Sequence, residues 1–148
     1  MKVVVQRVSS ASVSVNGQIT GQINQGLLIL FGAQEGDLDE DTVWLVNKLK
    51  HLRIFNDADG KMNLSLVDID GSVLVVSQFT LFGDCRKGRR PSFVQAAQPH
   101  EANRLYEKFC TEIREAEIQC ATGIFAADMK VTLTNDGPVT LILDTRNR

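Results

Sequence analysis

Residues 1–33, MKVVVQRVSSASVSVNGQITGQINQGLLILFGA, carry the pattern that decides the fold. Hydrophobic and polar residues alternate through KVVVQRV and through ASVSVNGQITGQI, and this period places every second side chain on one face of a β-strand. The pair Asn16-Gly17 lies within the alternation and is a strong short-range signal for a hairpin. The run GLLILFGA is apolar throughout, which is typical of a strand buried on both faces. We therefore predict three strands at the start of the chain.

Two later segments have the period of amphipathic helices. DEDTVWLVNKLKHLRIF, from Asp39, begins with acidic residues that suit a helix N-terminus, and it places Thr42, Leu45, Leu49 and Leu52 on one face. PHEANRLYEKFCTEI, residues 99–113, predicts a second helix. The inward face of this second helix consists of Ala102, Leu105, Phe109, Cys110 and Ile113.

The remaining segments predict strands. MNLSLVDIDGSVLVVSQFTLF is expected to form two strands around Asp70-Gly71, and EIQCATG, MKVTLT and VTLILD are expected to form three more. MKVTLT and VTLILD flank the turn-type residues NDGP, which favours a hairpin over residues 132–144. Pro138 has no N–H for a ladder, so it is tolerated only at a strand start, an edge or a bulge.

The predicted element order is βββαββαβββ. It indicates a mixed α/β fold in which two helices cover a largely antiparallel or mixed sheet system. The chain has 148 residues, enough for one domain with its own core, and we expect residues 1–148 to form that single domain.

Composition narrows the class of protein. The formal net charge of −2 provides no global basic field, so any contact with nucleic acid must come from a local patch. The three cysteines show no C-x-x-C spacing, which argues against a disulfide framework and a zinc site and favours a reducing cytosol. No stretch approaches the roughly 18 apolar residues that a membrane span needs. We expect a soluble, cytoplasmic protein without a membrane partner.

Histidine is scarce. His51 and His100 are the only two, so mechanisms that need a histidine base have few ways to be assembled. No phosphate-binding or dinucleotide glycine-rich loop is present. We expect an enzyme, if this is one, to work without histidine, metal or cofactor.

Two segments are not explained by periodicity. In VLVVSQFTLFGD, a buried strand ends with Ser77, Gln78 and Thr80 around Phe79, where side chains and backbone N–H groups could reach a ligand or could satisfy the strand end itself. CRKGRRPSF contains the densest basic patch of the chain, which consists of Arg86, Lys87, Arg89 and Arg90. Four such cations suit phosphate groups, although a basic loop can also be only a solvated face.

These segments carry a resemblance. SQFTL at 77–81, KGRRPSF at 87–93 and NDGPVT at 135–140 resemble the defining motifs of the D-aminoacyl-tRNA deacylases. MKVVVQRVSSASVSVNG and GLLILFGA are similar to the same family, so the resemblance spans essentially the whole chain. The chain departs from the family pattern at Gly83 and Ala126, where the family has alanine and glycine respectively.

The resemblance implies a cytoplasmic homodimer with a three-layer α/β/β fold and with active sites at the subunit interface. The family hydrolyses the ester between a D-amino acid and the 3′-terminal ribose of tRNA, as proofreading in translation. In this family the Gly-Pro peptide, here Gly137-Pro138, is cis and reaches into the other subunit's active site as a chirality filter. An L-amino acid would direct its side chain into that backbone, and glycine, which has no hand, is expected to pass.

The resemblance also assigns roles to individual residues. Arg7 resembles the arginine that steadies the Gly-Pro carbonyls, Phe125 and Met129 are expected to flank the terminal adenosine, and residues 77–80 are expected to form the catalytic strand end. Two mechanisms stay open: Thr80 as the nucleophile, or assistance by the 2′-hydroxyl of the tRNA, which the poverty in histidine favours. The competing class of function is a dimeric RNA-binding module without catalysis.

Overall fold

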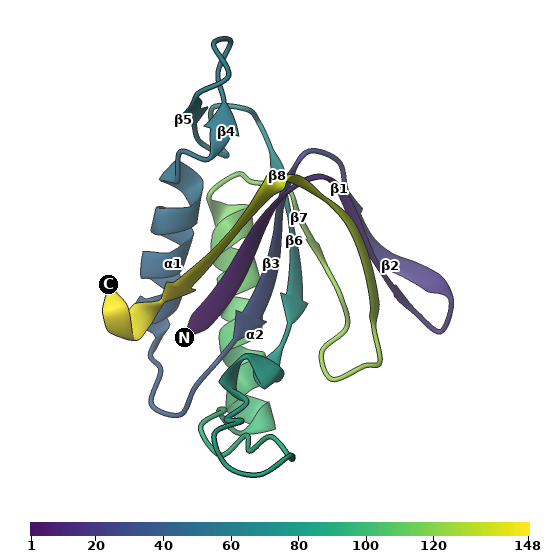
Figure 1. Ribbon diagram of the computed structural model, residues 1–148, viewed down its shortest axis with the longest axis vertical. Helices are drawn as coiled ribbons and strands as arrows, with labels where there is room; N and C mark the ends of the chain where they lie inside the picture. Colours follow the sequence, from purple (N-terminus) through teal and green to yellow (C-terminus); the bar gives the residue numbers. More distant parts are fainter.

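The structure is a computed structural model that describes residues 1–148, and strand β1 lies at its centre (Figure 1). β1 (Lys2–Val15) pairs antiparallel with β2 (Gln18–Ile23), β3 (Gly26–Gly32) and β8 (Lys130–Asp144). Its first half lies between β3 and β8, and its second half lies between β2 and β8. The three strands predicted at the start of the chain are confirmed.

The other strands of the main sheet run parallel to one another. β6 (Ser72–Ser77) pairs with β3 on one side and with β7 (Cys120–Thr122) on the other. Parallel neighbours need a long crossover, and each crossover here contains one helix: α1 (Asp39–His51) or α2 (Pro99–Glu115). Because helices cover one face and strands cover the other, β3 and β6 are buried on both faces, as their continuous apolar sequences predict.

Two hydrophobic cores divide the molecule into three layers. The larger core fills the space between the helices and the sheet, and Leu105 and Phe109 of α2 are fully buried there. The smaller core lies on the opposite face, where β1 and β8 arch over the sheet and carry β2 with them (Figure 1). It includes Val13 of β1 and Leu74 of β6. The three layers are the two helices, the sheet, and the strands that arch over its other face. This order confirms the predicted α/β/β fold class.

Both helices have the predicted inward faces, with small differences. In α1, Thr42, Leu45 and Leu49 are buried and Val46 joins them, whereas Leu52 lies beyond the helix end and is only half-buried. In α2, Ala102 is half-buried and Tyr106 adds to the predicted face. Neither helix combines the length and the apolar character that crossing a membrane would require.

The hairpin predicted over residues 132–144 is wrong. β8 is a single strand that keeps one direction through NDGP, and both of its halves pair with β1. β1 offers an edge along its whole length, so both halves obtain their ladder hydrogen bonds without a reversal of the chain. The turn-type residues instead form an insertion: Gln6 pairs with Thr140 and Val8 pairs with Asn135, so residues 136–139 leave the ladder opposite Arg7.

The two strands predicted around the Asp70-Gly71 pair are present, one on each side of that pair, but they do not pair with each other. The segment before Asp70-Gly71 forms β5 (Met62–Leu64), which pairs with the short strand β4 (Phe55–Asn56). Asp68 turns the chain away after β5, because its carboxylate accepts hydrogen bonds from the backbone N–H of Ser65 (2.8 Å) and from its hydroxyl (2.6 Å). The observed element order is therefore βββαβββαββ, with β4 added and the last two predicted strands joined into one.

Candidate active site

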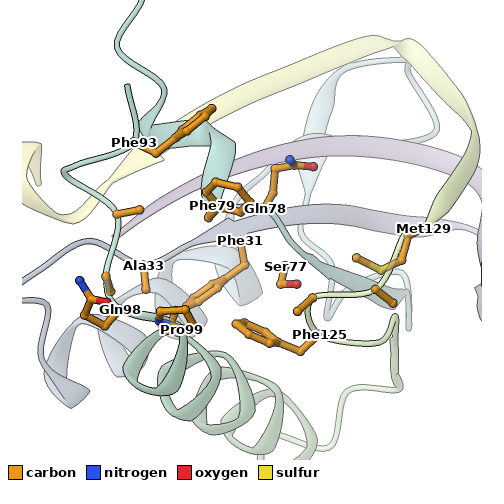
Figure 2. A pocket seen from close by; sticks show the side chains of 15 residues that line it. Phe31, Ala33, Ser77, Gln78, Phe79, Phe93, Gln98, Pro99, Phe125 and Met129 are labelled. Carbon is orange, nitrogen blue, oxygen red and sulfur yellow. The ribbon is translucent and has the colours of Figure 1, made fainter. Parts of the chain in front are cut away.

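A cavity of about 460 Å³ lies at the carboxyl end of β6, beside the start of α2 and the loop between β7 and β8 (Figure 2). Of the 15 lining residues 11 are hydrophobic, so a bound molecule would meet mainly apolar surface with a few polar groups to orient it. The lining consists of Phe31, Ala33, Ser77, Gln78, Phe79, Phe93, Ala96, Ala97, Gln98, Pro99, Ala102, Phe125, Ala126, Ala127 and Met129.

The SQFTL motif supplies the polar side of this cavity. Gln78 makes the last backbone bond of β6, donating its N–H to the Phe31 carbonyl (2.7 Å). The chain then enters a 3₁₀ turn, η1 (Phe79–Phe82), whose first N–H groups have no carbonyl acceptor within the turn. Thr80 is exposed beside the cavity, and the Gln78 side-chain amide donates a hydrogen bond to its hydroxyl oxygen.

Aromatic side chains form the walls. Phe79, 56% exposed, meets Phe93 edge to face at 5.1 Å between ring centroids. Phe125 packs against Tyr106 at 6.1 Å, and the Tyr106 hydroxyl donates to the Val75 carbonyl (3.0 Å). Burial raises the pKa of Tyr106, so this residue stays neutral and supports Phe125.

Phe31, Phe93 and Pro99 also line the cavity, although no sequence pattern gave them a role. Phe93 closes the KGRRPSF motif and could have been found from that position. Phe31 and Pro99 look like ordinary strand and helix-start residues, and no local signal marks them.

A tight turn places Phe125. Residues 124–127 are closed by a hydrogen bond from the Ala127 N–H to the Ile124 carbonyl (3.2 Å), and Ala126 takes the third position with φ 61°. A turn with positive φ at this position normally has glycine there. The departure of Ala126 from the family pattern therefore falls where the backbone prefers glycine, and Ala126 adopts the required conformation nevertheless.

The basic loop, residues 84–92, leads from η1 to the cavity wall at Phe93. Its ends are joined by two backbone hydrogen bonds between Asp84 and Ser92 (2.7 and 2.9 Å). Arg86 is paired with Asp84 (2.6 Å) and lowers the pKa of that carboxyl to about 2 through their hydrogen bonds. The other three predicted cations, Lys87, Arg89 and Arg90, are exposed and form no ion pair.

Arg7, Gly137 and Pro138 form a second, separate group. Arg7 is 5% exposed; its Nε donates to the Asp136 carbonyl (3.1 Å) and its Nη1 to the Ile54 carbonyl (2.6 Å). Gly137 and Pro138 are exposed, their peptide bond is cis, and neither they nor Arg7 line the cavity of their own chain. The structure thus brings together Ser77, Gln78, Phe79, Phe125 and Met129 and leaves the Gly-Pro pair apart from them.

No histidine, aspartate or glutamate lines the cavity. His100, in the first turn of α2, is exposed. No three His, Cys, Asp or Glu side chains converge anywhere in the chain as metal ligands would. The side chains that can act in the cavity are amides and hydroxyls.

Comparisons with known proteins agree with this arrangement. The family model described as D-Tyr-tRNA(Tyr) deacylase matches residues 4–144. A D-aminoacyl-tRNA deacylase of Geobacter sulfurreducens is 58% identical over 148 residues, covering 100% of this chain and 97% of the relative. One of Thermosipho melanesiensis is 58% identical over 147 residues, covering 99% and 98%.

Two solved structures have the same fold. The c-Myc DNA Unwinding Element Binding Protein superposes with a TM-score of 0.91 at 38% identity, covering 97% of this chain and 98% of that protein. A probable eukaryotic D-amino acid tRNA deacylase superposes with a TM-score of 0.79 at 21% identity, covering 96% and 97%. Sequence motifs, cavity and full-length relatives lead to one conclusion: this chain belongs to the D-aminoacyl-tRNA deacylase family, hydrolases that act on the ester bond of aminoacyl-tRNA.

Proposed function

We propose that this protein removes D-amino acids and glycine from tRNA in the cytoplasm, as proofreading in translation, with the aminoacylated adenosine bound in the cavity at the end of β6. The observation that carries the proposal is the position of SQFTL, because Ser77 and Gln78 at its strand end supply, with Gln98, the polar side chains of a mainly aromatic and aliphatic cavity. An adenine ring needs apolar, aromatic surface, and an ester needs hydrogen-bond donors.

Each part of the substrate has a matching group. Phe125 and Met129 hold the adenosine, and residues 77–80 face the ester. The exposed cations Lys87, Arg89 and Arg90 bind phosphates of the tRNA acceptor end, since the basic loop ends at the cavity wall.

For the chemistry we favour assistance by the terminal 2′-hydroxyl of the tRNA. A threonine nucleophile needs a base to take its proton, and the Thr80 hydroxyl is approached by a Gln78 amide N–H, which can only donate. Free N–H groups at the start of η1 are suited to the developing oxyanion.

The position of Thr80 gives a direct test of this mechanism. Thr80→Ala should retain measurable single-turnover hydrolysis of D-tyrosyl-tRNA, as should Thr80→Ser. Complete loss in the alanine variant, with recovery in the serine variant and a trapped acyl-enzyme, would establish Thr80 as the nucleophile instead.

The chirality filter is proposed to come from a second copy of the chain. Gly137 and Pro138 are exposed on β8, follow Asp136, whose carbonyl accepts a hydrogen bond from Arg7, and do not line the cavity of their own chain. On the same outward face of β8, two residues beyond Thr140, Ile142 is 67% exposed and pairs with Val4 of β1. An exposed isoleucine beside the Gly-Pro pair suits a contact in a homodimer.

Ester hydrolysis tests the activity. Purified protein is incubated with D-tyrosyl-, L-tyrosyl- and glycyl-tRNA, and the loss of the ester is followed. We expect rapid loss of the D-tyrosyl and glycyl esters and slow loss of the L-tyrosyl ester. Binding of all three without turnover would support the alternative of a non-catalytic RNA-binding dimer.

Mixed dimers test the cross-subunit arrangement. One copy carries Ala102→Phe, which fills the cavity, and the other carries Gly137→Ala, which disturbs the filter. If the cavity of one copy uses the filter of the other, the mixed dimer has one intact site and is more active than either parent variant. No recovery in a verified mixed dimer would place the filter and the cavity in the same copy.

A further inference from the structure

We infer that Asn135 is a positioning residue: its side-chain amide sets how Gly137 and Pro138 project from β8. The inference rests on the proposed function of that pair. Asn135 is the last residue of β8 to pair with β1 before the insertion at residues 136–139, and Thr140 is the first to pair after it. An insertion of this size would ordinarily be a mobile loop with unpaired ladder groups at its base.

The Asn135 amide satisfies those groups. Its Nδ2 donates to the carbonyl of Arg7 on β1 (3.0 Å) and to the carbonyl of Val139 at the far end of the insertion (2.9 Å). Both partners can only accept, so they fix which end of the amide faces them. The first bond replaces a ladder contact that the insertion removed, and the second closes the base of the loop.

The oxygen of the amide is held as firmly. Asn135 Oδ1 accepts hydrogen bonds from the Thr140 hydroxyl (3.0 Å) and from the Gln6 amide (3.2 Å), two residues that face each other across the ladder. The amide therefore uses both donors and two acceptor positions. This accounts for the two ends of the NDGPVT motif, whose Asn and Thr together close a clasp around the Gly-Pro pair.

Arg7 links the clasp to the rest of the molecule. Its carbonyl accepts from Asn135, while its guanidinium bonds the Asp136 carbonyl (3.1 Å) inside the insertion. The main chain and the side chain of one buried residue thus hold the loop from two directions. The side chain at position 135 must both donate and accept hydrogen bonds. Aspartate has the same shape as asparagine, but its carboxylate can only accept.

The test compares Asn135→Asp with Thr134→Ala in the full-length protein, the control being an exposed neighbour on β8 whose side chain makes no hydrogen bond. In Asn135→Asp we expect the ratio of D- to L-tyrosyl-tRNA hydrolysis to fall at least tenfold while KM for tRNA stays within twofold. Amide hydrogen exchange of Asp136, Gly137 and Val139 should also accelerate at least tenfold. Thr134→Ala should change neither quantity.

Further variants separate the possible failures. Thr140→Val removes one hydrogen bond to Asn135 and keeps the side-chain shape, so a smaller fall in the D/L ratio is expected even if Asn135→Asp does not fold. An unaltered ratio and unaltered exchange in a folded Asn135→Asp or Thr140→Val variant would overturn the inference. If Gly137→Ala also leaves the D/L ratio unaltered, the proposal that the Gly-Pro pair is the filter is wrong. Faster amide exchange in Asn135→Asp would then still establish that Asn135 holds the insertion in place.

Discussion

At the scale of single residues, Gly137 and Ala126 show how backbone conformation limits the side chain. Gly137 has φ +118°, and an added Cβ would lie 2.8 Å from Arg7 Nη2 and 2.9 Å from Val139 Cγ2. Arg7 is buried and hydrogen-bonded, so it cannot move away easily. Ala126 has φ 61° and tolerates a conformation that glycine adopts at lower cost.

Gly137→Ala should lower the free energy of unfolding by about 2–4 kcal/mol, through the backbone conformation and the steric contact together, and should reduce D-tyrosyl-tRNA turnover. Gly60→Ala is the control: Gly60 has φ +75° with nothing within 4 Å of an added Cβ. It should show only the backbone cost of about 1–2 kcal/mol. Urea denaturation measures the free energy of unfolding of both variants. Equal losses of stability would mean that the contact with Arg7 is relieved without cost.

Ala126→Gly should raise the free energy of unfolding by about 0.5–1 kcal/mol, because relief of the left-handed conformation exceeds the added chain entropy. The neighbouring Ala127, which has no positive φ, provides the comparison. Ala127→Gly should be neutral or destabilising. Thermal melts compare the stabilities of the two variants with that of the parent protein. A loss of stability in Ala126→Gly would contradict the interpretation of the turn.

At the scale of elements, the outer layer formed by β1, β2 and β8 packs over the smaller core only because β2 lies very close to β7. An added Cβ at Gly21 of β2 would lie 2.6 Å from the carbonyl oxygen of Thr122 in β7 and 3.2 Å from Leu74 Cδ1. Leu74 belongs to β6 and Thr122 to β7, and the Thr122 carbonyl, as part of the backbone of a paired strand, cannot move aside easily. Glycine at this position lets the outer layer close over the smaller core.

Gly21→Ala should therefore cost about 1–3 kcal/mol of unfolding free energy, since the two layers must separate to admit one methyl group. Gln22→Ala, at the next and exposed position of β2, should change it by no more than about 0.5 kcal/mol. Denaturant titrations of the two variants provide the measurement. Equal stabilities would show that β2 can shift outward freely.

At the scale of the whole molecule, electrostatic attraction of tRNA depends on the basic loop, residues 84–92. The chain has 16 basic and 18 acidic residues, so its overall field does not attract tRNA. Within the basic loop Arg86 is already neutralised by Asp84, whereas Lys87, Arg89 and Arg90 are free. These three cations are therefore the ones available to phosphates.

Replacing Arg89 and Arg90 together by alanine should weaken tRNA binding and flatten its salt dependence by about one unit of logarithmic slope per lost phosphate contact. Arg86→Ala should change the slope less, because that side chain is engaged by Asp84. The D/L preference should not change in either variant. Dissociation constants measured over a series of KCl concentrations test this, and equal slopes in all proteins would assign the loop to the solvated surface.

The sequence by itself determined the elements whose signals are local. The alternation through residues 2–23, the apolar run of β3 and the faces of α1 and α2 are set by which side chains are apolar at periods of two and 3.6, and these predictions are confirmed. The motifs SQFTL, KGRRPSF and NDGPVT likewise indicate the family and mark the polar end of β6 from sequence alone.

Only the tertiary structure decided which strands pair. The hairpin predicted over residues 132–144 failed because both halves of β8 pair with β1 from the other end of the chain, and β6 pairs with β3 and β7 rather than with β5. A turn signal shows where a chain can bend, but ladder hydrogen bonds go to whichever edge is free, and for β8 that edge is β1 at the other end of the chain. The meeting of Phe31, Phe93 and Phe125 around Ser77 and the clasp of Asn135 arise in the same way. They depend on contacts between distant segments, which no local pattern records.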